Sequence, residues 1–249
     1  MAEHTFFLIT LLGKNIIAPN ILELRFSKPA NFSFSPGQFV QFQIPDGEKN
    51  VLRSFSLSSA PHHDYLEFCI KILPDGKASV FLSGLPVGET AMISGAKGRF
   101  VCDSLGANYF IATGTGLAPI TSMVSHLVER QTIQTTVVGQ AGIAVREKVQ
   151  TAVSEQPLSV LFGVRYAEDL FWVDRLHSFR SRIANYSVRV AVSRPTEQWL
   201  ELRGRVSEHV IIDKEGHYYL CGSLDMVKDV RAILLKADVP AKNIHQEIY

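Results

Sequence analysis

Residues 53–56 form a short segment whose side chains could bind a planar, phosphorylated ligand. Arg53 offers a flat fork of donors to a phosphate, and Phe55 can stack on a planar ring. The hydroxyl groups of Ser54 and Ser56 can hydrogen-bond ring atoms. In a regular strand residues 53 and 55 face one side and residues 54 and 56 the other, so a bend or a wrapping ligand is needed to unite them. Taken alone, the segment favours an ordinary polar edge strand over a ligand site.

Two glycine-containing segments could bind phosphate groups through their backbone N–H groups. Gly114-Thr115-Gly116 follows an apolar run and precedes a helical pattern, where a pyrophosphate could meet a helix N-terminus. Pro119 replaces the last glycine of the usual dinucleotide fingerprint. A second segment opens another apolar run and consists of Gly76, Lys77, Ala78 and Ser79. Each also fits an ordinary turn or helix start.

The elements that would position the arginine segment are short strands. Residues 21–26 and 39–44 alternate apolar and polar side chains, and residues 66–72 and 91–94 continue the pattern. Pro and Gly turns separate them, which predicts a small antiparallel β-barrel. Residues 78–85 are apolar enough for a short helix beneath it.

The pattern changes near residue 104, where strands begin to alternate with helices. The predicted strands cover residues 109–112, 159–164, 188–192 and 217–221. This alternation predicts an α/β domain with a parallel sheet. The chain therefore divides into residues 1–103 and 104–249. Residues 131–157 fit poorly, and an added pair of surface helices is favoured there over a flap above a ligand.

Composition excludes several classes of function. Residues 1–103 hold nine Lys/Arg and nine Asp/Glu of the 25 and 24 in the chain, which leaves 16 and 15, so neither half is a basic nucleic-acid-binding arm. The apolar stretches fall far short of the roughly 20 residues of a membrane span. The three cysteines lack the spacing of a zinc or iron–sulfur site, and the histidines lack ligand spacing, so no metal is expected. A reduced, cytoplasmic setting fits the odd number of cysteines.

The order of these segments resembles that of the ferredoxin–NADP reductases and related flavin reductases over nearly the whole chain. Each matching stretch is weak alone, and their order makes the resemblance specific. The stretches are residues 36–39, 53–56, 76–79, 95–100, 112–119, 162–165, 193–195, 219–222 and 247–249. The resemblance implies an N-terminal FAD-binding barrel and a C-terminal NAD(P)-binding α/β domain.

The same resemblance assigns the flavin side of the site. Arg53 would bind the FAD pyrophosphate, and Phe55 would replace the family's usual Tyr against the flavin. Ser56 would lie near flavin N5, the atom that accepts the hydride. The remaining FAD-binding residues would be Ser54, Ile70, Lys71, Gly76, Lys77, Ala78 and Ser79.

The resemblance also assigns residues near the nicotinamide, and these lie later in the chain. Cys221 would lie near the nicotinamide ring, Glu247 would tune its geometry, and the terminal Tyr249 would stack on the flavin rather than pack on the sheet edge. Ser56, Cys221, Glu247 and Tyr249 are thus the candidate catalytic residues. Further dinucleotide-binding residues would be Gly114, Thr115, Gly116, Gly163, Arg165, Ser193, Arg194, Gly222 and Met226. Ser193-Arg194 favours NADPH over NADH, since the pair resembles a 2′-phosphate site.

The implied activity is hydride transfer from NAD(P)H to bound FAD, followed by electron delivery to a carrier such as ferredoxin or flavodoxin, or the reverse. The alternatives are the reductase component of a multicomponent oxygenase, an NAD(P)H:flavin reductase, and a non-enzymatic flavin-binding regulatory subunit. The expected partners are an electron-carrier protein and a nicotinamide nucleotide.

Overall fold

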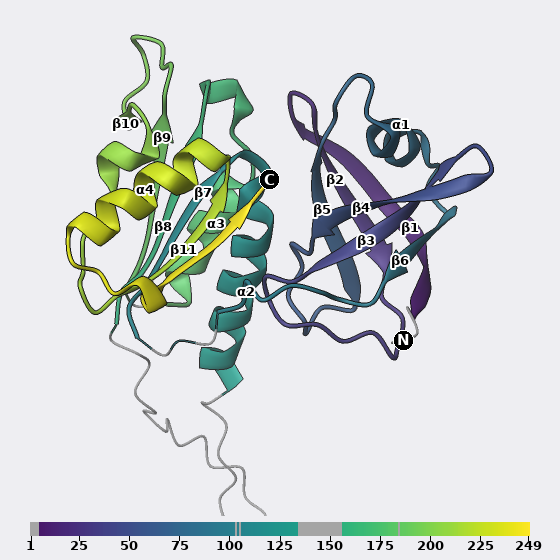
Figure 1. Cartoon of the computed structure of the whole chain (residues 1–249), viewed down its shortest axis with the longest axis horizontal. Coiled ribbons are helices and arrows are strands. Elements are labelled where there is room, and N and C mark those ends of the chain that lie inside the picture. Colours follow the sequence, from purple (N-terminus) through teal and green to yellow (C-terminus); the bar gives the residue numbers. More distant parts are fainter. Residues whose placement is uncertain (1–4, 103, 105, 134–155, 184) are drawn as a thin grey trace, which may run out of the picture.

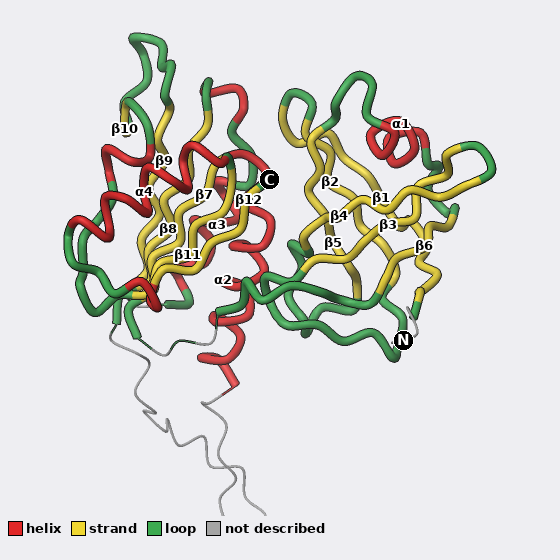
Figure 2. The backbone as a smooth tube through the Cα atoms, in the orientation of Figure 1, coloured by secondary structure: helices red, strands yellow, loops and turns green. Residues whose placement is uncertain are grey.

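A computed structural model gives the fold of the chain, and it describes residues 5–102, 104, 106–133, 156–183 and 185–249. The described strands gather in two sheets, drawn in yellow in Figure 2. The helix pair or flap expected for residues 131–157 lies mostly outside the described residues. Of the helices in the described ranges, none combines the length and apolar character needed to cross a membrane.

The first sheet is antiparallel and has the order β4-β3-β6-β1-β2-β5. Its elements are β1 (Phe6–Ala18), β2 (Ile21–Ser27), β3 (Phe39–Asp46), β4 (Lys49–Ser56), β5 (Tyr65–Lys71), helix α1 (Lys77–Gly84) and β6 (Thr90–Ser94). Alternation in β3 places Val40, Phe42 and Ile44 inside, as the sequence pattern predicted. The predicted N-terminal barrel is thereby confirmed.

The second sheet is parallel and has the order β10-β9-β8-β7-β11-β12. Its strands are β7 (Asn108–Thr113), β8 (Leu158–Val164), β9 (Tyr186–Val192), β10 (Leu202–Arg203), β11 (His217–Gly222) and β12 (Ile244–Ile248). Its α-helices are α2 (Leu117–Ile133), α3 (Val173–Ser178) and α4 (Leu224–Lys236). The predicted α/β class is confirmed, and the 103/104 boundary stays a prediction.

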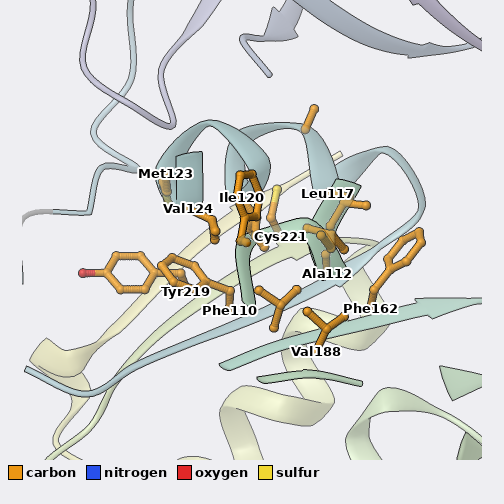
Figure 3. Close-up of a cluster of buried hydrophobic side chains, with 14 of the residues drawn as sticks. Phe110, Ala112, Leu117, Ile120, Met123, Val124, Phe162, Val188, Tyr219 and Cys221 are labelled. Carbon is orange, nitrogen blue, oxygen red and sulfur yellow. The ribbon is translucent and has the colours of Figure 1, made fainter. Parts of the chain in front are cut away.

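Helices cover both faces of the parallel sheet. Helix α4 packs on one face through Val227, Val230 and Leu234. Helix α2 packs on the other, where Ile120, Met123 and Val124 meet strand side chains (Figure 3). This second cluster also contains Ala18, Ile21 and Cys69 of the barrel, so one apolar core crosses the boundary between the two sheets. Figure 1 shows α2 on the barrel side of the parallel sheet, with the C-terminus pointing toward the space between the two.

Candidate active site

The barrel is open between its two edge strands, and the predicted flavin residues flank the opening. The bridge between Leu57 and Phe68, with the 2.8 Å bond from Ser58 N to the Glu67 carbonyl, supplies the main-chain pairing between these edges within residues 5–102. Continuing that register places residues 53–56 opposite residues 69–72. Main-chain groups on two facing edges are thus left for a ligand, which fits a flat ring system inserted between them.

Arg53 is exposed on this edge, and its Nη1 donates to the neighbouring Leu52 carbonyl at 2.9 Å. Phe55 is half-buried and meets Phe42 edge-on, with ring centroids 5.7 Å apart. Phe55 therefore packs against the barrel core. Ile70 points into that core and is buried, so its main chain rather than its side chain faces the opening.

The predicted phosphate segment lies at the start of α1. Gly76 occupies the N-cap position of this helix and forms no side-chain capping hydrogen bond. Ser79 is buried, and its Oγ accepts from Leu73 N at 2.9 Å, so its hydroxyl stabilises the preceding turn. Lys77 pairs with Asp46 at the β3–β4 turn. The open donors of this segment are therefore the backbone N–H groups of the first helical turn, which suit a phosphate.

Gly114, Thr115 and Gly116 form the turn between β7 and α2, as expected. Gly114 has φ +55°, and a Cβ there would meet nothing within 4 Å, so the turn leaves room for a ligand. A Cβ on Gly116 would instead collide with the Cys221 carbonyl, so this glycine allows the turn to lie directly on β11. The close approach brings Thr115 beside the end of β11, where Cys221 lies.

Ser56 of the barrel contacts residues of the nucleotide domain in the site. Its Oγ donates to Glu247 Oε1 at 3.1 Å and accepts a hydrogen bond from the Tyr249 hydroxyl. Strand β12 sets this position because it pairs with β11 in a register that matches Cys221 with Glu247. The Tyr249 amide donates to the Gly222 carbonyl at 3.1 Å, which holds the terminal residue at the same end. The structure thus joins three of the four predicted catalytic residues by hydrogen bonds and puts Cys221 beside Glu247.

Desolvation is the largest cause of the pKa shifts of Cys221, Glu247 and Tyr249. It raises the pKa of the Cys221 thiol well above its ordinary value, and the nearby Glu247 charge adds to that rise. Burial also raises the pKa of Glu247, against the hydrogen bonds from Ser56 and Tyr249. The pKa of Tyr249 is raised by desolvation of its hydroxyl, although the residue as a whole is 51% exposed, and by Cys221 and Glu247. The thiol and the phenol therefore stay protonated near neutral pH and act as hydrogen-bonding groups.

The predicted dinucleotide-binding residues Arg165, Ser193 and Arg194 lie on two neighbouring loops after β8 and β9. Ser193 N donates to the Val164 carbonyl at 3.1 Å, and Arg194 N to the Arg165 carbonyl at 2.9 Å. The exposed Arg194 side chain donates to the Tyr166 hydroxyl at 3.2 Å. These contacts bring Arg165, Ser193 and Arg194 together on one surface.

Three other predicted residues have packing roles in the structure. A Cβ on Gly163 would collide with Val206, and one on Gly222 would collide with Thr113. Met226 is buried among the residues under α4, and its amide N donates to the N-cap Ser223 Oγ at 3.4 Å. The Met226 side chain therefore lies apart from the residues around Ser56.

A set of polar contacts joins the two domains and was not predicted from the sequence. Glu67 of β5 is fully buried and forms an ion pair with Arg175 of α3. Trp172 donates through Nε1 to Glu23 Oε2 at 2.7 Å, and Ser122 Oγ of α2 donates to the Ser59 carbonyl at 2.6 Å. A glutamate among the apolar residues of the strand at 66–72 was the available signal.

An open barrel edge that suits a flat ring system, together with a glycine turn that leaves room for a nucleotide, is typical of a flavin- and nicotinamide-dependent oxidoreductase. The profile "Oxidoreductase FAD-binding domain" matches residues 8–102, and "Oxidoreductase NAD-binding domain" matches residues 110–232. The chain belongs to the FAD- and NAD(P)-binding oxidoreductases of the ferredoxin reductase type.

Relatives of known function include oxygenase reductases and a ferredoxin reductase. The chain is 28% identical over 232 residues to the toluate 1,2-dioxygenase electron transfer component of Pseudomonas putida, covering 91% of this chain and 62% of that protein. It is 32% identical over 200 residues to methane monooxygenase component C of Methylosinus trichosporium, covering 77% of this chain and 52% of that protein. It is 28% identical over 255 residues to ferredoxin–NADP reductase B of Sorangium cellulosum, covering 96% of each.

A solved structure shares the fold over the full length. The ferredoxin NADP+ reductase from Neisseria gonorrhoeae, determined with bound FAD and NADP, superposes with a TM-score of 0.78 at 21% identity. The match covers 99% of both chains. The two-sheet arrangement of this chain is therefore the fold of that structure.

Proposed function

We propose that this chain takes a hydride from NADPH onto FAD and passes the electrons to a carrier protein such as ferredoxin or flavodoxin. The observation that carries this proposal is the meeting of Ser56, Glu247 and Tyr249 at the open edge of the barrel. Bound FAD would supply the ability to accept a hydride and release electrons singly.

The residues of the chain would bind and orient the two nucleotides. Arg53 and the backbone at the start of α1 would hold the FAD phosphates, with Ser54, Phe55 and the main chain of residues 70–71 beside the ring. The Ser56 hydroxyl would hold the reacting edge, since Glu247 and Tyr249 fix its direction. Thr115 and its flanking glycines would admit the nicotinamide nucleotide. Holding the two reacting rings in one geometry and excluding water is the main contribution that a protein makes here.

NADPH is the preferred donor in this proposal because Arg194 is exposed beside Tyr166 and Ser193. A guanidinium with free surface around it suits a 2′-phosphate. Arg203, another arginine nearby, is engaged differently: its Nη2 donates to the carbonyls of Thr196, Glu197 and Trp199 at 2.8 to 3.0 Å. The preference therefore rests on Arg194.

Delivery of electrons to an oxygenase system is the second candidate, favoured by the similarity to the toluate dioxygenase and methane monooxygenase components. Cys69, Cys102 and Cys221 are thiols outside any disulfide, which suits a reducing compartment such as the cytoplasm.

The test is anaerobic addition of electron acceptors to protein that has been loaded with FAD and reduced with NADPH. Rapid reoxidation by ferredoxin or flavodoxin, with slow reoxidation by free flavin, is expected. Reoxidation by free flavin alone would instead assign a flavin reductase. Protein that cannot take up FAD would contradict the proposal.

A further inference from the structure

The fully buried carboxylate of Glu67 accepts hydrogen bonds from side chains of both domains. Its Oε1 accepts from Ser58 Oγ at 3.0 Å and from Arg175 Nη1 at 2.6 Å. Its Oε2 accepts from Arg25 Nη2 at 3.2 Å. Ser58 and Arg25 belong to the barrel, whereas Arg175 belongs to α3 of the nucleotide domain. We call Glu67, Ser58, Arg25 and Arg175 the Glu67 cluster.

Each arginine of the Glu67 cluster forms a cation–π contact with an aromatic ring. The Arg25 guanidinium lies 4.3 Å from the centroid of Tyr65, and that of Arg175 lies 4.9 Å from the centroid of Trp172. Trp172 itself hydrogen-bonds Glu23 of the barrel. It does so from φ +56°, a conformation that residues other than glycine rarely adopt. The start of α3 is therefore fixed to the barrel at two points.

The Glu67 cluster is connected directly to the segment that carries Ser56. Ser58 N donates to the Glu67 carbonyl at 2.8 Å, and Glu67 N donates to Ser59 Oγ at 3.1 Å. The Ser59 carbonyl in turn accepts from Ser122 of α2, the helix that follows the Gly114–Gly116 turn. Residues 56–59 thus begin at the open edge of the barrel, then contact Glu67, and then contact helix α2.

We propose that Glu67 and Arg175 are positioning residues, which set the orientation of the nucleotide domain on the barrel and thereby the approach of nicotinamide to flavin. This role presupposes the flavin reduction proposed above. Neither side chain would touch a nucleotide; both would act through residues 56–59 and α3.

General energetics favour a positioning role over a purely stabilising one. A buried ion pair adds little net stability because desolvation offsets its attraction, yet its hydrogen bonds fix direction. Domains joined by an ordinary interface move relative to one another by default. A displacement of about 1 Å between reacting groups can slow a reaction about 100-fold. Loss of the Glu67 cluster should therefore affect the transfer step more than nucleotide binding.

The test compares Glu67→Gln and Arg175→Gln with the unmodified protein, and Lys214→Gln serves as the control. Lys214 pairs with Asp238 on the surface of the nucleotide domain, with both side chains well exposed. The measurements are FAD content, the dependence of the flavin reduction rate on NADPH concentration, and the rate at which a thiol reagent labels Cys69, read by mass spectrometry. Cys69 is buried in the apolar core shared by the two domains, so its labelling reports their separation without any turnover.

The expected result is a limiting reduction rate lowered about tenfold or more in both variants, with FAD content and the NADPH concentration for half-maximal rate changed less than about twofold. Cys69 should be labelled faster in both, and Arg175→Lys should recover part of the rate because it retains the charge. The Lys214→Gln control should match the unmodified protein.

A limiting rate within about twofold of the unmodified protein, or a rate loss that only follows FAD loss, would overturn the role. Unmodified protein that binds FAD but is not reduced would overturn the proposed function itself, so the two failures are distinguishable. If Glu67→Gln fails to fold, Arg175→Gln decides the question, since it leaves Arg25 and Ser58 on the carboxylate.

Discussion

Ser56 donates one hydrogen bond to Glu247 and accepts another from Tyr249, so its hydroxyl has a fixed direction. Ser56→Ala removes both bonds together with the group expected beside the flavin. We expect the limiting rate of flavin reduction to fall about 100-fold or more with little change in FAD content, a typical effect of losing one placed polar group. Stopped-flow reduction measures it. Ser181→Ala, which removes an exposed hydroxyl bonded only locally to the Ser178 carbonyl, is the matched control. Equal loss in both variants would exclude a specific role.

Arg194 determines the predicted preference for NADPH. Arg194→Ala should raise the KM for NADPH about tenfold, because a charge-assisted hydrogen bond to phosphate is worth more than about 1 kcal/mol. The KM for NADH should stay nearly constant in the same variant, which makes NADH the internal control. Steady-state kinetics with both nucleotides decide this. A parallel rise in both KM values would show that Arg194 supports the loop rather than a 2′-phosphate.

His63 should make the protein sensitive to mild acid. Burial, with help from the neighbouring His62 and Arg175 charges, lowers its pKa from 6.5 to about 4, and its Nδ1 accepts from Ala60 N at 3.3 Å. The unfolded chain therefore takes up this proton first, and the stability contributed by neutral His63 is lost as pH falls from about 6.5 toward about 4. Thermal unfolding of His63→Gln should show a smaller drop between neutral pH and that range. An unchanged drop would assign the acid sensitivity to other groups.

At the level of elements, the turn between β7 and α2 depends on a glycine without room for a side chain. Gly116→Ala would place a Cβ against the Cys221 carbonyl, which must shift to admit it. We expect a loss of about 1–3 kcal/mol in the free energy of unfolding, as for other overpacked sites, and weaker NADPH binding. Chemical denaturation measures the first. Gly13→Ala, where a Cβ meets nothing within 4 Å, is the control and should change stability little. Equal effects would mean that the turn tolerates a side chain.

The elements were largely predictable because their patterns are local. Alternation predicted β3, and turn residues separated the barrel strands, since burial of one face leaves that signature in the sequence. Strand β12 was not predicted, because its five residues carry only the family's terminal signature and derive their place from pairing with β11. The Ser56–Glu247 contact joins residues 191 apart, and no local rule gives such a pairing. The contact between Glu67 and Arg175 was not predicted for the same reason, since the two residues are 108 apart in the sequence.

For the whole molecule, the arrangement of the two domains decides whether the site can work. The apolar core that includes Cys69, together with the Glu67 cluster, joins a barrel open at one edge to the parallel sheet, whose Gly114–Gly116 turn contacts strand β5 at that edge. Sequence resemblance implied both domains, whereas the side chains that join them come from the structure. Electron flow from nicotinamide to flavin and onward is the function that this arrangement supports.

The most direct test of that central claim is anaerobic mixing of FAD-loaded protein with NADPH that carries deuterium at the transferring position. We expect rapid loss of the visible absorbance of oxidised flavin, and a slower loss with the deuterated nucleotide because the hydride moves in the measured step. Flavin that binds but stays oxidised with both NADPH and NADH would contradict it.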